Sequence, residues 1–79
     1  MMNSLFDPSQ ILAHLEKAER HVRDGELRVE RQRTLLAKLR VGGHPTDEAE
    51  ILLARFQDIL RELNFHRNRL RQELREKTI

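Results

Sequence analysis

The apolar residues of this chain follow alternating steps of four and three positions through two long segments, and this spacing limits the possible folds more than any other feature. Such steps place every position on one stripe of an α-helix, as at positions a and d of a coiled-coil heptad. The first stripe comprises Ile11, Leu15, Ala18, Val22, Gly25, Val29, Gln32, Leu36 and Leu39, and the second comprises Ala49, Leu53, Phe56, Leu60, Leu63, Arg67, Leu70 and Leu74. The sequence therefore predicts an all-α chain of two long amphipathic helices.

Helix start and stop signals divide the two stripes. Asp7 before Pro8 is a typical helix start, because an aspartate caps free amides and proline suits the first helical position. Gly42 is expected to end the first helix in the left-handed conformation, and Thr46 to cap the second. The predicted organisation is one domain over residues 1–79, with a first helix over about 8–41, a turn at 42–46 and a second helix over about 47–77.

The short turn and the distribution of charge favour an antiparallel hairpin over one continuous helix. Residues 7–26 carry five acidic and three basic residues, and residues 27–40 carry one acidic and five basic residues. The second helix has the opposite order, with four acidic and one basic residue in 47–60 and three acidic and six basic residues in 61–77. Folding the chain at the turn brings each half beside a segment of opposite net charge.

Each apolar stripe is wider than the contact between two helices requires. Leu52 and Ile59 flank the stripe of the second helix, and Leu12 and Leu35 flank that of the first. A stripe of this width is typical of a helix that packs against two neighbours. We therefore expect two hairpins to form a homodimeric, coiled-coil-like four-helix bundle. The predicted core and dimer residues are Leu15, Val22, Gly25, Val29, Leu36, Leu52, Phe56, Ile59, Leu60, Leu63 and Leu70.

Each polar residue near the stripes can be interpreted either as a functional residue or as a structural one. His21 and His66 are level in the hairpin and form a weak candidate site for a divalent metal, but histidines at the edge of a stripe more commonly reach into solvent. Arg67 and Gln32 lie within the apolar stripes, where a single polar residue can set the register of the helices. We therefore expect no metal and no cofactor, and a structural role for Arg67 and Gln32.

Two features suggest an outer surface for a partner. Leu27 and Phe65 occupy the outward heptad position, where an apolar side chain is unusual. Either the N-terminal segment with Leu5 and Phe6 covers Phe65, or Phe65 marks a partner surface. Arg67, Arg69 and Arg71 lie in the most basic stretch of the chain, which suits phosphate groups. The possible partner surface therefore comprises Leu27, Phe65, Arg67, Arg69 and Arg71.

Composition narrows the classes of function. The chain has no cysteine, a net charge of +2 and no apolar run of membrane-spanning length. It also lacks a nucleophile beside a base and a phosphate-binding loop, so enzyme activity is not expected. The favoured function is a small, cytoplasmic, homodimeric interaction or regulatory protein that binds another protein, with no membrane association. The alternative is a small RNA- or DNA-binding hairpin dimer that uses its arginine-rich faces.

Several segments carry a resemblance to known sequences. They are residues 18–22 (AERHV), 25–26 (GE), 32–33 (QR), 43–46 (GHPT), 52–56 (LLARF) and 69–70 (RL). On these segments, from about Ala13 to Leu74, the chain resembles a group of small uncharacterised helical-hairpin proteins of soil alphaproteobacteria. The resemblance implies no activity. In shape alone, the predicted architecture is also similar to the RNA-binding hairpin dimer that controls plasmid copy number.

Overall fold

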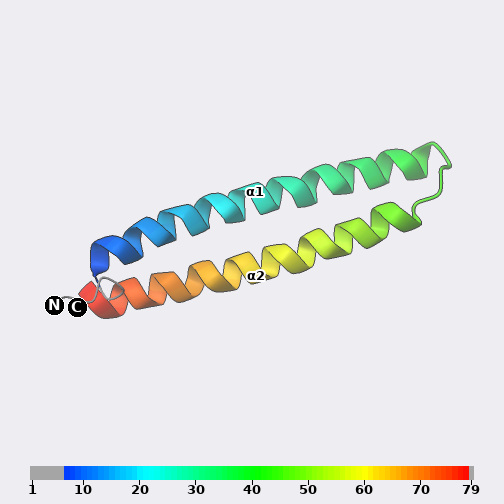
Figure 1. The fold of residues 1–79 in the computed structure, drawn as a ribbon. Coiled ribbons are helices and arrows are strands. Elements are labelled where there is room, and N and C mark those ends of the chain that lie inside the picture. Colours follow the sequence, from blue (N-terminus) through cyan, green and yellow to red (C-terminus); the bar gives the residue numbers. More distant parts are fainter. Residues whose placement is uncertain (1–6, 79) are drawn as a thin grey trace.

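A computed structural model describes residues 7–78, which form two long helices side by side (Figure 1). Helix α1 spans Pro8–Val41 and helix α2 spans Asp47–Thr78. The helices are antiparallel, so the start of α1 lies beside the end of α2 (Figure 1). This arrangement confirms the predicted all-α helical hairpin. Residues 1–6 and 79 of the predicted domain lie outside the described residues.

The start of α1 has the predicted cap. Asp7 lies in extended backbone conformation, with φ −76° and ψ 123°, and one of its carboxylate oxygens accepts a hydrogen bond from the Ser9 amide at 2.9 Å. The Ser9 hydroxyl donates to the same oxygen at 2.9 Å. Pro8 occupies the first turn, where its missing N–H removes no helical hydrogen bond. Together these residues satisfy amide groups that the first turn leaves without an intrahelical partner.

The end of α1 corrects one sequence-based prediction, because the left-handed residue is Gly43 and not Gly42. Gly42 has φ −80° and continues the helical conformation, whereas Gly43 has φ +70°. The Gly43 amide donates to the Arg40 carbonyl at 3.1 Å, and the His44 amide donates to the Leu39 carbonyl at 2.9 Å. These two bonds form a Schellman motif, which requires the left-handed residue one position later than the sequence suggested.

The start of α2 uses Thr46 differently from a standard cap. The Thr46 hydroxyl donates to the Glu50 carboxylate at 2.7 Å, and the Thr46 carbonyl accepts from the Glu50 amide at 2.9 Å. Asp47, Glu48 and Glu50 place negative charge in the first turn, where the helix dipole stabilises it. The turn is therefore held on both sides by local hydrogen bonds.

The two helices bury their apolar stripes to different extents. The α1 stripe is buried at Ile11, Leu15, Ala18, Val22, Gly25, Val29, Gln32 and Leu36, with exposed fractions of 7% or less for the residues other than glycine. On α2 only Ala49 is buried, and the remaining stripe residues from Leu53 to Leu74 are half-buried. In the middle of the hairpin, small α1 residues such as Val22 and Gly25 pack against leucine side chains of α2 that extend beyond them. The large α1 residues Leu15 and Leu36 are nevertheless buried as completely as the small ones.

Gln32 is the one buried polar side chain among the described residues. Its amide nitrogen donates to the Ala49 carbonyl at 3.0 Å, across the seam and close to the turn. A buried amide without such a partner would destabilise the folded state, so the bond favours the register in which Gln32 reaches the first turns of α2.

At Gly25 the backbone of α1 lies close to side chains of the opposite helix. A Cβ atom built at this position would lie 3.2 Å from Cδ1 of both Leu60 and Leu63. The two leucine methyl groups therefore occupy the space that a larger residue at position 25 would need.

Substitution of Gly43 tests the corrected end of α1. We expect Gly43→Ala to lower the free energy of unfolding by about 1 kcal/mol, because the left-handed conformation is strained for a residue with a Cβ atom. Gly43→Asn should lower it by less, since asparagine adopts this conformation more readily. Urea unfolding at one fixed protein concentration measures both. Equal stability of Gly43→Ala and the original chain would contradict the assignment.

Substitution of Gly25 tests the close contact with Leu60 and Leu63. Gly25→Val should lower the free energy of unfolding by about 1–3 kcal/mol, because its branched side chain overpacks the seam. Gly25→Ala should change it by less than about 1 kcal/mol, because the gain in helix propensity opposes a small displacement of two flexible side chains. Thermal unfolding followed by circular dichroism measures both. A valine variant more stable than the alanine variant would show that the space is open.

Candidate interaction surface

The hairpin has two long faces, one on each side of the seam, and one of them is polar. Two ion pairs between the helices lie on it, Glu19–Arg71 at 3.0 Å and Arg40–Glu50 at 3.9 Å. Gln57 and Asn64 lie between them along α2, and the Asn64 amide donates to the Leu60 carbonyl at 3.0 Å. We call this the ion-paired face. Its polar groups are paired within the chain or open to water.

The opposite face is apolar. It is formed by Leu35, Leu52, Phe56, Ile59 and Leu63, and we call it the apolar face. The side chains of Leu35, Leu52 and Ile59 are 46%, 39% and 45% exposed, and Phe56 and Leu63 are half-buried. An exposed leucine is ordinary in isolation, but a continuous row beside a half-open seam is typical of a protein-binding surface.

Two hollows lie on the apolar face. One, of about 250 Å³, is lined by His21, Asp24, Gly25, Arg28, Phe56, Ile59 and Leu63. The other, of about 370 Å³ and closer to the turn, is lined by Gln32, Leu35, Leu39, Pro45, Glu48, Ala49 and Leu52. Both are shallow depressions along the seam, which suits the side chains of another helix better than a small molecule.

The structure divides the predicted core and dimer residues into three groups. Leu15, Val22, Gly25, Val29 and Leu36 are buried within the hairpin. Phe56, Leu60, Leu63 and Leu70 are half-buried, and Leu52 and Ile59 are exposed. Burial within one chain thus accounts for the α1 residues, whereas the α2 residues keep exposed area beside the seam.

The histidines lie at the edge of the apolar face. His21 lines the hollow beside Asp24 and Arg28, and both His21 and His66 are exposed. Within residues 7–78, no three histidine, aspartate or glutamate side chains come together in a way that would hold a metal ion. The arrangement therefore gives no support for assigning a metal-binding role to His21 and His66.

The residues of the predicted partner surface lie on separate sides of the hairpin. Leu27 and Phe65 are 51% and 66% exposed and occupy the outward position of different helices, so they point away from each other. Arg67 is half-buried and donates to the Asn68 side chain, and Arg71 pairs with Glu19. The five residues therefore do not form one patch: Leu27 lies on α1, whereas Phe65 and Arg69 are exposed one turn apart on α2.

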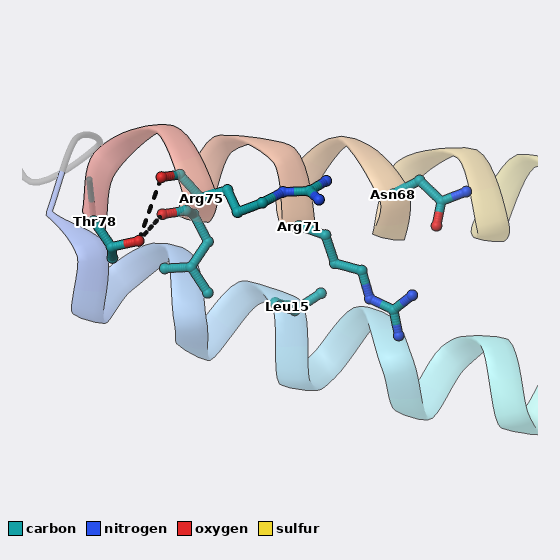
Figure 2. A pocket seen from close by; sticks show the side chains of 6 residues that line it. Leu15, Asn68, Arg71, Arg75 and Thr78 are labelled. Atoms are coloured by element: carbon teal, nitrogen blue, oxygen red, sulfur yellow. Dashed lines mark hydrogen bonds between the residues drawn. The ribbon is translucent and has the colours of Figure 1, made fainter.

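A further groove lies at the open end of the hairpin, between the start of α1 and the end of α2 (Figure 2). Arg71 reaches from α2 towards α1, while Arg75 extends along its own helix (Figure 2). The Thr78 hydroxyl donates to the carbonyls of Leu74 and Arg75 at 2.9 and 3.4 Å. Leu15 and Leu74 give the groove an apolar floor. The groove thus combines two arginines with aliphatic side chains, and one of these arginines already has a carboxylate partner.

Comparisons with models of known protein families, with curated proteins and with solved structures gave no match. The resemblance to small proteins of soil alphaproteobacteria therefore stays a prediction. Within residues 7–78, neither helix has the length and apolar character that crossing a lipid bilayer requires.

Proposed function

We propose that this chain is a non-enzymatic helical interaction or regulatory module, which forms a homodimer and binds another protein through its outer surface. Two hairpins pack their apolar faces together and form an antiparallel four-helix bundle. The observation that carries the proposal is the difference between the two faces. The apolar face exposes Leu35, Leu52 and Ile59 beside a half-buried seam, whereas the other face carries two ion pairs between the helices and is lined mainly by polar side chains between them.

Energetics supports self-association. A single pair of helices buries little apolar area relative to the conformational entropy that folding removes. Burying a leucine or isoleucine side chain contributes about 1.5–3 kcal/mol when it goes from full exposure to full burial. The partly exposed residues of the apolar face, doubled by symmetry, would therefore contribute several kcal/mol to a dimer at roughly this scale.

A second copy is also the partner that every solution of this protein contains. A face-to-face dimer would cover the apolar face and leave Leu27 and Phe65 on the outside, because the outward position points away from the bundle centre. We therefore assign binding of another protein to the surfaces around Leu27 and Phe65. The absence of cysteine suits a reducing compartment, and we propose a cytoplasmic location.

Nucleic-acid binding has less support. Arg67, Arg69 and Arg71 occupy three different heptad positions, and Arg71 is paired with Glu19. A net charge of +2 is also small for a surface that would attract a phosphate backbone.

Substitution of one residue on the apolar face tests the homodimer. Ile59→Asp should raise the dimer dissociation constant by at least a hundredfold, because it places two carboxylates in an apolar contact. Sedimentation equilibrium over a wide concentration range measures the dissociation constant. Circular dichroism checks that the Ile59→Asp variant is still helical.

Ile51→Asp is the matched control. Ile51 is 58% exposed, lies on the outward side of the same helix and receives the same substitution. Its dissociation constant should stay within about threefold of the original chain, a change below 1 kcal/mol. A monomeric original chain at all concentrations, or equal weakening by both substitutions, would refute the proposed dimer face.

A further inference from the structure

We propose that the second copy runs in the opposite direction, with the two turns at opposite ends of the bundle and a two-fold axis that crosses the apolar face near Ile59. We call this two-fold arrangement head to tail. This inference rests on the homodimer proposed above and specifies its orientation. It comes from the charged residues along the edges of the apolar face, which the two possible two-fold arrangements bring together differently.

Both outer edges of the apolar face carry charge. The edge corresponds to heptad position c, and its assignment is supported by Asp24 and Glu48, which line the two hollows. In the proposed dimer the d and g positions of facing helices pack together, so position c lies at the rim of that contact, as e and g do beside an a/d contact. The edge residues are Lys17, Asp24, Arg31 and Lys38 on α1, and Glu48, Arg55, Glu62, Arg69 and Glu76 on α2.

Contacts between the helices show which residues are level along the hairpin. Glu19 pairs with Arg71, and a Cβ atom at Gly25 would meet Leu60 and Leu63. The residue numbers of these contacts add to about 88, from 85 to 90. Residues of α1 and α2 whose numbers add to about this value therefore lie at the same height.

The first arrangement places both turns at the same end. Its two-fold axis is parallel to the helices, so α1 of one copy packs on α2 of the other and the copies cannot slide along each other. Edge residues at equal height then meet, and three of the four charged pairs repel. The pairs are Arg31–Arg55, Asp24–Glu62 and Lys17–Arg69, which are alike in charge, and Lys38–Glu48, which is opposite.

The second arrangement places the turns at opposite ends. Its axis is perpendicular to the helices, so each helix packs antiparallel on its own copy and the register is free to adjust. With the axis at Ile59, three pairs of opposite charge form, each twice by symmetry. They are Arg55–Glu62, Glu48–Arg69 and Asp24–Arg31. Lys17–Lys38 is the like-charged pair at the rim. Arg28 lies near Arg28 of the other copy, with Asp24 beside it in the same hollow.

Two other registers of the second arrangement are less favourable. An axis at the middle of the hairpin places Asp24 against Asp24 of the other copy and Glu62 against Glu62 of the other copy. It also places Arg55 against Arg69. An axis closer to the open end restores opposite charges but leaves Leu35 and Leu52 outside the contact. Of the registers compared, the one centred near Ile59 gives opposite charges at three of four rim pairs and brings the apolar α2 residues Phe56, Ile59 and Leu63 to the centre, with Arg28 on the α1 side.

The size of the contact is sufficient in this register. The hairpin is 62 Å long and 19 Å wide. An axis three or four residues from the middle displaces the copies by about 10 Å, which leaves an overlap of roughly 50 Å. The footprint is then on the order of 900 Å² per copy, close to the value of about 800 Å² for a stable interface.

Reversal of charge at Glu62 distinguishes the arrangements, because they predict opposite signs. In the head-to-tail dimer, Glu62→Arg replaces two attractions to Arg55 with two repulsions, and the dissociation constant should rise about tenfold at low salt. With the turns together, the introduced guanidinium would instead meet Asp24 and tighten the dimer. Arg55→Glu should likewise weaken the head-to-tail dimer, and the double variant Arg55→Glu/Glu62→Arg should restore the original dissociation constant to within about threefold.

Asp58→Arg is the matched control, since it changes the net charge equally from the outward side of α2, where Asp58 pairs with Arg61. It should leave the dissociation constant within about threefold. Tighter association of the Glu62→Arg or Arg55→Glu variant, or a dimer unaffected by either, would overturn the head-to-tail orientation while leaving the homodimer intact. A monomeric original chain would overturn both proposals.

Discussion

The two helices bury their apolar stripes unequally, and this difference determines most of what the hairpin presents to its surroundings. α1 contributes small residues such as Ala18, Val22 and Gly25, and α2 contributes large ones such as Phe56 and Leu63. A small residue is covered completely by a large neighbour, but the large neighbour then extends past it on both sides. The α1 stripe is buried at large residues such as Leu15 and Leu36 as well as at small ones, and the α2 stripe keeps exposed edges on both sides of the seam.

The exposed edges of the α2 stripe have polar neighbours on one face of the hairpin and apolar neighbours on the other. On the ion-paired face, Glu19–Arg71 and Arg40–Glu50 lie across the helices, and Asn64 bonds to the backbone of α2. Such exposed pairs contribute little free energy each, but an apolar surface packed over them would have to displace their water. On the apolar face no ion pair between the helices lies across the seam within residues 7–78, and leucine and isoleucine border it. The two faces of the hairpin therefore differ in polarity, and the row of exposed aliphatic side chains lies on one of them.

The repeating part of this fold was predictable from sequence, and its local exceptions were not. Heptad spacing predicted two helices because every residue of a stripe contributes to the same pattern. The left-handed residue was placed wrongly at Gly42, because two adjacent glycines suit a helix end equally and only the bonds of Gly43 and His44 distinguish them. The bond from Gln32 to the Ala49 carbonyl likewise depends on how far one side chain bends along the seam, which a heptad position does not encode.

The location of the outward apolar residues has a consequence for any partner. In the head-to-tail dimer each helix lies beside its own copy, so both Phe65 side chains belong to the α2 side of the bundle and both Leu27 side chains to the α1 side. A partner that contacts one side therefore meets a symmetric pair of the same residue. With the turns together, each side would instead present one Leu27 and one Phe65. The orientation of the dimer thus decides whether the outer surface suits a two-fold symmetric partner or an asymmetric one, because symmetry duplicates the contacts that each side offers.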